Sequence, residues 1–400
     1  RAAVLLEQGA DEFAVLMARE MGKPVREGRA EVKKCAWVCR YYAENGEEFL
    51  KEISIETDAF KSCVRHEPLG PVLAVMPWNF PFWQVFRFAA PALMAGNTAV
   101  LKHASNVPGC ALAIESVFLE AGFPEDVFRT LLISSSAVEP VIRDSRIKAA
   151  TLTGSEPAGR SVASVAGSEI KKTVLELGGS DPYIVLEDAD LKACAETAVK
   201  ARMINTGQSC IAAKRFIVVD PVLEAFEEEQ LKIITSLKIG DPIDEDTDIG
   251  PLARQDLVDD LDKQVRDSLE KGAELKIGGK RMEGDGFFYK PTLLTNVSEG
   301  MAAYEEETFG PVTAIIPAKD EDDAVRIAND STFGLGGSLW TQDLKKGERL
   351  ARDIQSGAVF VNGMTKSDPR LPFGGIKRSS YGRELSHYGI REFVNVKTIW

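Results

Sequence analysis

The sequence is poor in the residues that usually build disulfide scaffolds and metal centres. It contains six cysteines and three histidines in 400 residues, and no CxxC pair. These numbers exclude a disulfide-stapled secreted domain and a structural zinc site of the common type. We therefore expect reduced thiols, a cytoplasmic location and chemistry that uses no metal.

The chain also lacks an excess of positive charge and any long hydrophobic run. Its 48 basic and 61 acidic residues give a formal net charge of −13, which disfavours nucleic acid and anionic membranes as partners. No apolar run approaches the ~20 residues of a membrane span. The sequence starts at Arg1, inside an amphipathic stretch and without Met, so we expect that residues are missing before it.

Short apolar runs alternate with helical patterns from about residue 70. The predicted strands are 71–77, 98–102, 127–133, 148–153 and 171–177. Strict alternation predicts a parallel sheet with helices on both faces, as in a doubly wound α/β domain that binds a cofactor. We expect residues 1–52 and 69–176 to form this dinucleotide-binding domain.

A second series of strands and helices follows and predicts a second α/β domain over 177–387, which we expect to be catalytic. Two elements interrupt this pattern. Residues 53–68 predict a β-hairpin, and the end of the chain, 388–400, is also strand-like. Exposed sheet edges favour pairing between chains, so we expect both segments to be oligomerisation strands of a homodimer or homotetramer.

No GxGxxG fingerprint is present, but TLTGSEPAGRS (151–161) approaches the phosphate loop GxxxxGK[ST]. Arg160 occupies the position of the essential Lys and is not equivalent to it, which argues against an NTPase. Gly154 and Ser155 nevertheless lie between a predicted strand and helix. Backbone N–H groups at such a helix N-terminus favour a phosphate.

Three further segments carry groups suited to catalysis. Cys210 lies in a turn of small polar residues, INTGQSC, and is either a nucleophile or an inert thiol. Glu176 ends an apolar strand just before a Gly pair and is either a general base of raised pKa or a salt-bridge partner. Asn79 lies between two prolines in MPWNFPFW and either donates to an oxyanion or caps a turn.

Six motifs in this order resemble the aldehyde dehydrogenase superfamily over essentially the whole chain. They are PWNFP, TGS, ELGG, GQSC, EETFGP and PFGGIK. Within the superfamily, GNTAVLKHASNVPG, LELGGSDP and GRELSHYG look most like the succinate semialdehyde dehydrogenase group. The resemblance implies NAD(P)-dependent oxidation of an aldehyde to a carboxylate.

The resemblance assigns a role to each of the three catalytic candidates. Cys210 would attack the aldehyde to give a thiohemiacetal, whose oxyanion Asn79 and the Cys210 backbone N–H would hold. Hydride loss would leave a thioester, and Glu176 would activate the water that hydrolyses it. A soft thiolate and an amide donor placed where charge develops suit this chemistry.

The resemblance also places the cofactor, NAD or NADP. The cofactor-binding residues it implies are Trp78, Lys102, Ser105, Gly154, Ser155, Glu307 and Phe309. NAD-selective relatives commonly carry Glu three residues after the Lys, where it repels a 2′-phosphate. Ser105 stands there in this chain, so we expect NADP to be accepted as well as NAD.

For the substrate, the resemblance implies a cationic pair that binds a distal carboxylate. Arg87 matches the first member, but the second position is Ile204. We expect Lys366, Ser367 or Arg370 to supply the missing contact. Two alternatives stay open: a general aliphatic or aromatic aldehyde dehydrogenase in which Arg87 forms only a salt bridge, and a non-catalytic dinucleotide-binding assembly protein with an inert Cys210.

Overall fold

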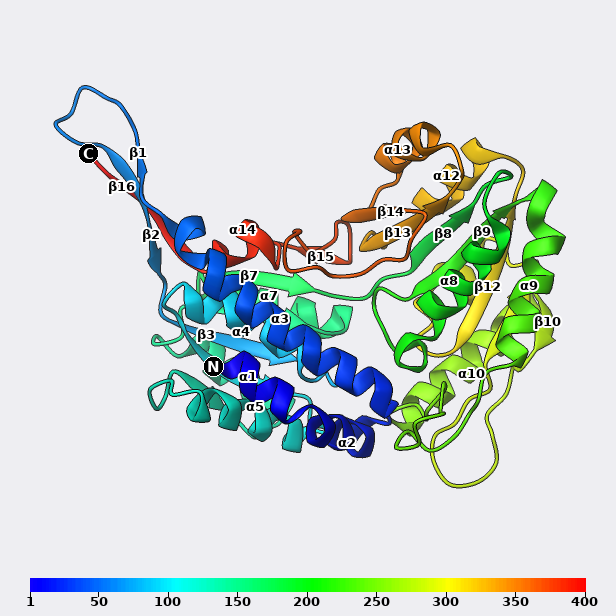
Figure 1. The fold of residues 1–400 in the computed structure, drawn as a ribbon, viewed down its shortest axis with the longest axis horizontal. Helices are drawn as coiled ribbons and strands as arrows, with labels where there is room; N and C mark the ends of the chain where they lie inside the picture. Colours follow the sequence, from blue (N-terminus) through cyan, green and yellow to red (C-terminus); the bar gives the residue numbers. More distant parts are fainter.

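The computed structural model describes the whole chain, residues 1–400, and consists of two lobes and a small projecting sheet (Figure 1). Each lobe is built on one large, mostly parallel sheet covered by helices. The predicted α/β class with a doubly wound parallel sheet is therefore confirmed. No helix has both the length and the apolar composition required to cross a membrane.

The first sheet has six strands in the order β15-β7-β6-β3-β4-β5. Their bounds are β3 Pro71–Met76, β4 Thr98–His103, β5 Phe128–Thr130, β6 Ala149–Thr153, β7 Lys172–Glu176 and β15 Ser380–Tyr381. Strands β3 to β7 pair in parallel, and only β15 is antiparallel to its neighbour β7. All five predicted strands are present, although β5 is shorter than the predicted 127–133.

Helices pack on both faces of this sheet, as the alternating pattern predicts. Their bounds are α4 Trp83–Met94, α5 Pro108–Glu120, α6 Val138–Arg143 and α7 Glu156–Ser168. Alternate residues of β3 point to opposite faces: Val72 and Ala74 join the core beneath α4 and α5, whereas Leu73 joins the core beneath α6 and α7. A strand buried on both faces has no polar side, which explains its continuous apolar sequence.

Three N-terminal helices form an additional layer over α4 and α5. They are α1 Ala2–Gln8, α2 Ala10–Met21 and α3 Val25–Leu50. Helix α3 crosses the front of the first lobe, and its first turns reach the second lobe (Figure 1). There the N–H of Val25 donates to Pro242 O (2.8 Å), and Arg26 forms an ion pair with Asp248 (2.8 Å). One face of α3 is thereby placed between the lobes.

The second sheet has seven strands in the order β10-β11-β12-β9-β8-β13-β14, of which only β10 is antiparallel. Their bounds are β8 Asp181–Val185, β9 Ala213–Val219, β10 Glu274–Ile277, β11 Thr292–Thr295, β12 Val312–Ala318, β13 Gly336–Trp340 and β14 Ala358–Val361. The helices that accompany them are α8 Leu191–Met203, α9 Leu223–Thr235, α10 Gln255–Glu270, α11 Ala302–Glu305, α12 Glu321–Asn329 and α13 Leu344–Asp353.

The third sheet has three strands, β1 Ile53–Ser54, β2 Cys63–Pro68 and β16 Val394–Ile399. The predicted hairpin is present, but β1 pairs with β2 over only two residues. The main partner of β2 is β16, which pairs antiparallel with it from Val394↔Pro68 to Ile399↔Cys63. The two predicted oligomerisation segments therefore form one sheet, which projects from the first lobe with the C-terminus at its end (Figure 1).

Candidate active site

Cys210 lies in the loop between α8 and β9, and this loop has an unusual backbone. Asn205 and Thr206 both adopt left-handed conformations (φ 52° and 56°), which cost energy for residues other than Gly. Asn205 is held by two contacts: its N–H donates to Glu27 Oε2 (2.6 Å), and its amide donates to Asn79 O (2.8 Å). The strained turn connects the Cys210 loop to α3 and to the PWNFP segment.

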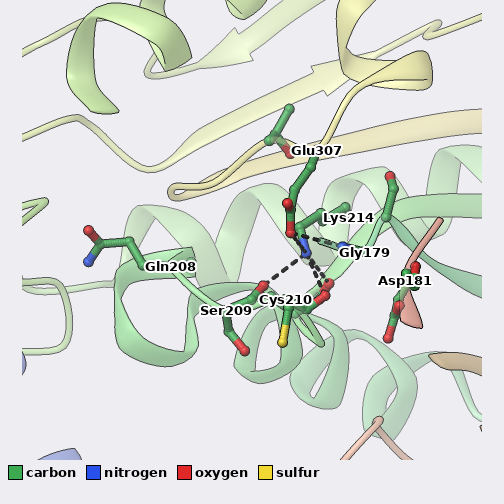
Figure 2. A network of polar contacts seen from close by, with 12 residues as sticks. Gly179, Asp181, Gln208, Ser209, Cys210, Lys214 and Glu307 are labelled. Carbon is green, nitrogen blue, oxygen red and sulfur yellow. Dashed lines mark hydrogen bonds and ion pairs between the residues drawn. The ribbon is translucent and has the colours of Figure 1, made fainter. Parts of the chain in front are cut away.

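Lys214, on β9, fixes the loop on its other side. Its buried ammonium donates to the carbonyl oxygens of Ser209 (2.8 Å) and Cys210 (2.9 Å), and it lies 3.4 Å from Glu307 (Figure 2). Glu307 in turn accepts from the Gly179 N–H (3.1 Å). In Figure 2 the carbonyl groups of Ser209 and Cys210 point toward Lys214, and the Cys210 sulfur points away from it.

The Gly178–Gly179 pair allows the strand segment after Glu176 to approach this network. A Cβ at Gly179 would lie 2.7 Å from Cys210 O, and one at Gly178 would lie 2.4 Å from Glu307 Oε2. The atom that a side chain at Gly179 would meet belongs to the backbone and cannot move aside, so close packing requires glycine at this position, whereas the Glu307 carboxylate opposite Gly178 is the end of a flexible side chain.

Two hydrogen-bond donors belong to the Cys210 loop or contact it. The Asn79 amide donates one N–H to Gln208 O (3.1 Å), which brings this side chain against the cysteine loop and leaves its second N–H available. The backbone N–H of Cys210 has no partner among the hydrogen bonds of the chain. A side-chain amide and a backbone N–H of this kind can stabilise a developing oxyanion.

Cys210 is a partly buried thiol on a large cavity. The cavity has a volume of about 500 Å³ and its wall includes Cys210, Arg87, Ile204 and Ser367. Burial raises the pKa of the Cys210 thiol to about 12, whereas the charges of Arg87 and Lys214 act in the opposite direction. The sequence-predicted nucleophile and two of the predicted substrate residues therefore share one space.

Glu176, at the end of β7, is buried and neither carboxylate oxygen has a hydrogen-bond partner. Burial, followed by the negative charge of Glu384, raises the pKa of Glu176 well above its ordinary value. A structural salt bridge would show a cation at these oxygens, and none is within ion-pair distance. The carboxyl group is therefore a buried acid of raised pKa, and its role as a general base stays a prediction.

The surroundings of Arg87 differ from the prediction, because the residue has a buried acidic partner. It lines the cavity, but its guanidinium forms a buried ion pair with Glu384 and donates to Thr153 Oγ1 (3.2 Å). Sequence analysis did not predict this partner, because Glu384 follows Arg87 by almost three hundred residues. The charge of Arg87 is therefore largely compensated inside the protein.

Of the three residues predicted to complete the substrate contact, the structure favours Ser367. It is buried and accepts a hydrogen bond from Lys34 (2.7 Å). Lys366 lines the cavity but is exposed. Arg370 pairs with Asp368 (2.7 Å) and lies over Trp37, away from the cavity wall. The Arg370 guanidinium thus already has a partner, and its contact with substrate stays a prediction.

Four of the cofactor candidates lie at or just beyond the carboxyl ends of strands in the first sheet, where doubly wound folds bind ligands. Lys102 is largely buried on β4 and forms no ion pair, while burial lowers its pKa. Ser105 is exposed just beyond it, and Gly154 and Ser155 precede the first turn of α7. A free ammonium, a hydroxyl and a helix N-terminus suit the phosphates of a dinucleotide.

Phe309 and Trp78 form an edge-to-face pair with ring centroids 5.9 Å apart, and Glu307 lies two residues before Phe309. This aromatic pair connects the PWNFP segment of the first lobe with EETFGP of the second. The predicted cofactor residues therefore fall into two groups, one at the ends of β4 and β6 and one beside the cysteine loop.

Known proteins resemble this chain over its whole length. The model of the aldehyde dehydrogenase family matches residues 1–399. The chain belongs to the aldehyde dehydrogenase family. It is 56% identical over 400 residues to a probable succinate-semialdehyde dehydrogenase [NADP(+)] of Synechocystis sp., covering 100% of this chain and 88% of that protein. It is 55% identical to the succinate-semialdehyde dehydrogenase [NADP(+)] of Mycolicibacterium paratuberculosis, covering 99% of this chain and 84% of the relative.

Solved structures of the family superpose closely. Succinic semialdehyde dehydrogenase from Streptococcus pyogenes in complex with NADP+ gives a TM-score of 0.98 at 40% identity, covering 100% of this chain and 88% of the other. Succinate-semialdehyde dehydrogenase from Burkholderia pseudomallei gives 0.97 at 34% identity, with 100% and 83% covered. The family resemblance inferred from the six motifs is therefore confirmed.

Sequence analysis missed the residues that hold the cysteine loop and part of the cavity. Lys214 and Arg202 are buried cations that bind backbone carbonyls, and Lys34 projects from α3 to the cavity. The only signal for Lys214 was a basic pair inside an apolar strand. Lys34 gave none, because charged residues are ordinary on an amphipathic helix.

Proposed function

We propose that the protein oxidises succinate semialdehyde to succinate with NADP+ or NAD+, through covalent catalysis by Cys210. The observation that carries this proposal is the cavity in which the Cys210 thiol, Arg87 and Ser367 meet. The two named relatives at 55% identity or more support the same substrate and NADP. The two alternatives, a general aldehyde dehydrogenase and a non-catalytic binding protein, become outcomes of the tests below.

In this proposal the Cys210 thiolate attacks the aldehyde carbon to give a thiohemiacetal. The free N–H of Asn79 and the backbone N–H of Cys210 donate to its oxyanion, and Lys214 keeps the loop in position. A nicotinamide cofactor held by these residues would supply the hydride acceptor, and loss of hydride from the substrate carbon leaves a thioester on Cys210. Glu176, with its raised pKa, then takes the proton of the water that attacks the thioester.

The chain offers a suitable set of groups for the cofactor. Lys102 and Ser105 would bind the adenosine ribose and its 2′-phosphate, and Gly154 and Ser155 would bind the pyrophosphate at the N-terminus of α7. Trp78, Glu307 and Phe309 would hold the nicotinamide end. The uncompensated Lys102 ammonium supports the presence of an anion there.

An assay of the purified protein tests the proposed function directly. Reduced nicotinamide is followed by absorbance with succinate semialdehyde, butanal and benzaldehyde, each with NADP+ and NAD+. We expect the highest kcat/KM with succinate semialdehyde and NADP+. A similar value for all three aldehydes would favour a general aldehyde dehydrogenase, and no reduction of cofactor would favour the non-catalytic alternative.

The Asn79→Ala variant should lower kcat by roughly 100- to 1,000-fold, because removal of one preformed oxyanion donor costs about that much. The KM should change little, since the donor acts after the carbonyl oxygen becomes charged. Steady-state kinetics of both proteins provide the comparison. An unchanged kcat would show that Asn79 serves only to hold Gln208.

The Ser105→Glu variant should reverse cofactor selection. A carboxylate beside Lys102 would repel the 2′-phosphate of NADP+, so the ratio of kcat/KM for NADP+ to that for NAD+ should fall roughly 10- to 100-fold. The matched control is Ser105→Gln, which has nearly the same size and no charge. Equal effects of both substitutions would show that bulk, and not charge, acts at this position.

We further propose a cytoplasmic homodimer or homotetramer that assembles through the β1-β2-β16 sheet. All six cysteines are free thiols, as suits a reducing compartment. Strand β16 is an edge strand of this sheet, and the side chains of Val396, Ile399 and Trp400 on or beside it are apolar and exposed. An exposed apolar edge strand favours pairing with a second chain. Sedimentation should give a dimer or larger, and a monomer at micromolar concentration would contradict the assembly.

A further inference from the structure

Lys34 is a cation on the cavity wall that the proposed mechanism does not use. It lies on α3, seven residues after Glu27 and on the same helical face, and its side chain is partly buried. The ammonium donates to Ser367 Oγ (2.7 Å) and lies 4.3 Å from the centroid of the Trp83 ring. Both contacts hold the end of a long side chain that would otherwise move freely.

The two carboxylates whose charges act on Lys34 are engaged with other partners. Glu31 forms a buried ion pair with Lys23 and accepts from the N–H groups of Phe82 and Trp83 (both 2.9 Å). Asp368 pairs with Arg370 (2.7 Å), and Glu384 pairs with Arg87. No carboxylate lies within ion-pair distance of Lys34 in the described chain.

Lys34 and Arg87 therefore differ in the charge they offer to a ligand. Arg87 presents a guanidinium that Glu384 already neutralises, whereas Lys34 presents an uncompensated ammonium. Keeping such a charge in a partly buried wall is unfavourable unless an anion binds it. The hydroxyl of Ser367 accepts from Lys34 and keeps its own proton available for the same anion.

We propose that Lys34 binds the distal carboxylate of the substrate and is the residue that selects ω-carboxy aldehydes over uncharged ones. This inference rests on the proposed function. Lys34 supplies the net charge, Ser367 donates a hydrogen bond, and Arg87 contributes a donor whose charge is balanced by Glu384. Ile204, on the same wall, adds only apolar surface. In this proposal α3 of the first lobe selects the substrate, whereas the Cys210 thiol that reacts with it belongs to the second lobe.

Binding of the distal carboxylate by Lys34 should depend on pH. Burial, followed by the charge of Arg87, lowers the pKa of Lys34 to about 8, whereas Cys35, Glu31 and Asp368 act in the opposite direction. The charged and titratable groups that act on Lys34 are thus Arg87 on α4, Glu31 and Cys35 on α3, and Asp368 in the loop before β15. Since the ammonium is present below this pKa and lost above it, the KM for succinate semialdehyde should rise above about pH 8.

The test compares Lys34→Met with the wild type on succinate semialdehyde and on butanal, which has the same chain length and no carboxylate. We expect kcat/KM for succinate semialdehyde to fall roughly 10- to 100-fold through KM, and that for butanal to change by less than about threefold. The control is Lys200→Met, which removes an exposed lysine of α8 at the same cavity and should change neither substrate by more than about threefold.

Equal losses on both aldehydes, or a loss as large in Lys200→Met, would overturn the assignment to Lys34. Failure of the proposed function is distinguishable, because the wild type itself would then show no preference for succinate semialdehyde over butanal. If Lys34→Met does not fold, the wild-type pH profile decides. A KM that rises above about pH 8 for succinate semialdehyde alone supports the proposal, and parallel profiles for both aldehydes overturn it.

Discussion

Replacing Cys210 by Ala should abolish aldehyde oxidation, with kcat reduced by at least about 10⁴-fold, because no other group can form the covalent intermediate. Binding of NADP+, measured by quenching of tryptophan fluorescence, should persist, since the groups proposed to bind its phosphates lie at the ends of β4 and β6, away from the Cys210 loop. The matched control is Cys39→Ala. This partly buried thiol lies on α3, and burial raises its pKa to about 12.

The pH dependence of the wild-type protein adds a second test of Cys210. Burial raises the pKa of the thiol to about 12 in the free protein, so most of the population is protonated at neutral pH. Because only the thiolate attacks, kcat/KM for butanal should rise as the pH is raised above neutrality. Butanal is the suitable substrate here, because its binding does not depend on the charge of Lys34.

The Glu176→Gln variant should separate the two halves of the reaction. Steady-state turnover should fall roughly 100- to 10,000-fold, the range expected for loss of a general base. The first turnover should still occur, so that rapid mixing gives a burst of about one reduced cofactor per active site. This expectation follows from the environment of Glu176, whose buried carboxyl group has no hydrogen-bond partner and a raised pKa.

Two results would contradict this role of Glu176. Loss of the burst together with turnover would mean that the carboxyl group is needed before the thioester forms, as a base for the Cys210 thiol. Unchanged turnover would mean that its raised pKa reflects burial alone. Glu176→Asp is a useful companion variant, because it keeps the acid and shortens its side chain by one methylene group.

Much of the first lobe was predictable, because each strand of its sheet is a short apolar run bounded by helical segments. The second lobe was less so: β8, β11 and β13 were not predicted as separate strands. Strand β13 begins with Gly336 and Gly337, which weaken any strand pattern. The predicted division of the chain into domains stays a prediction. Strand β15 pairs with β7 of the first sheet although about two hundred residues separate them, so the end of the chain adds a strand to the first lobe.

For the site, local motifs predicted the residues whose chemistry is unusual in their surroundings. Cys210 stands in a polar turn, and Glu176 ends an apolar strand. The residues that were missed act through tertiary contacts. The compensation of Arg87 by Glu384, and the position of Lys34 opposite Ser367, join segments about three hundred residues apart. No pattern within a single window of sequence could have indicated either contact.

The most direct test of covalent catalysis is mass spectrometry of the Glu176→Gln variant after mixing with succinate semialdehyde and NADP+ and rapid quenching in acid. The account predicts that the intact protein gains the mass of one succinyl group, and that peptide mapping places this group on the Cys210 sulfur. An unmodified protein in a sample that has reduced one equivalent of cofactor, or a succinyl group on any other residue, would contradict it.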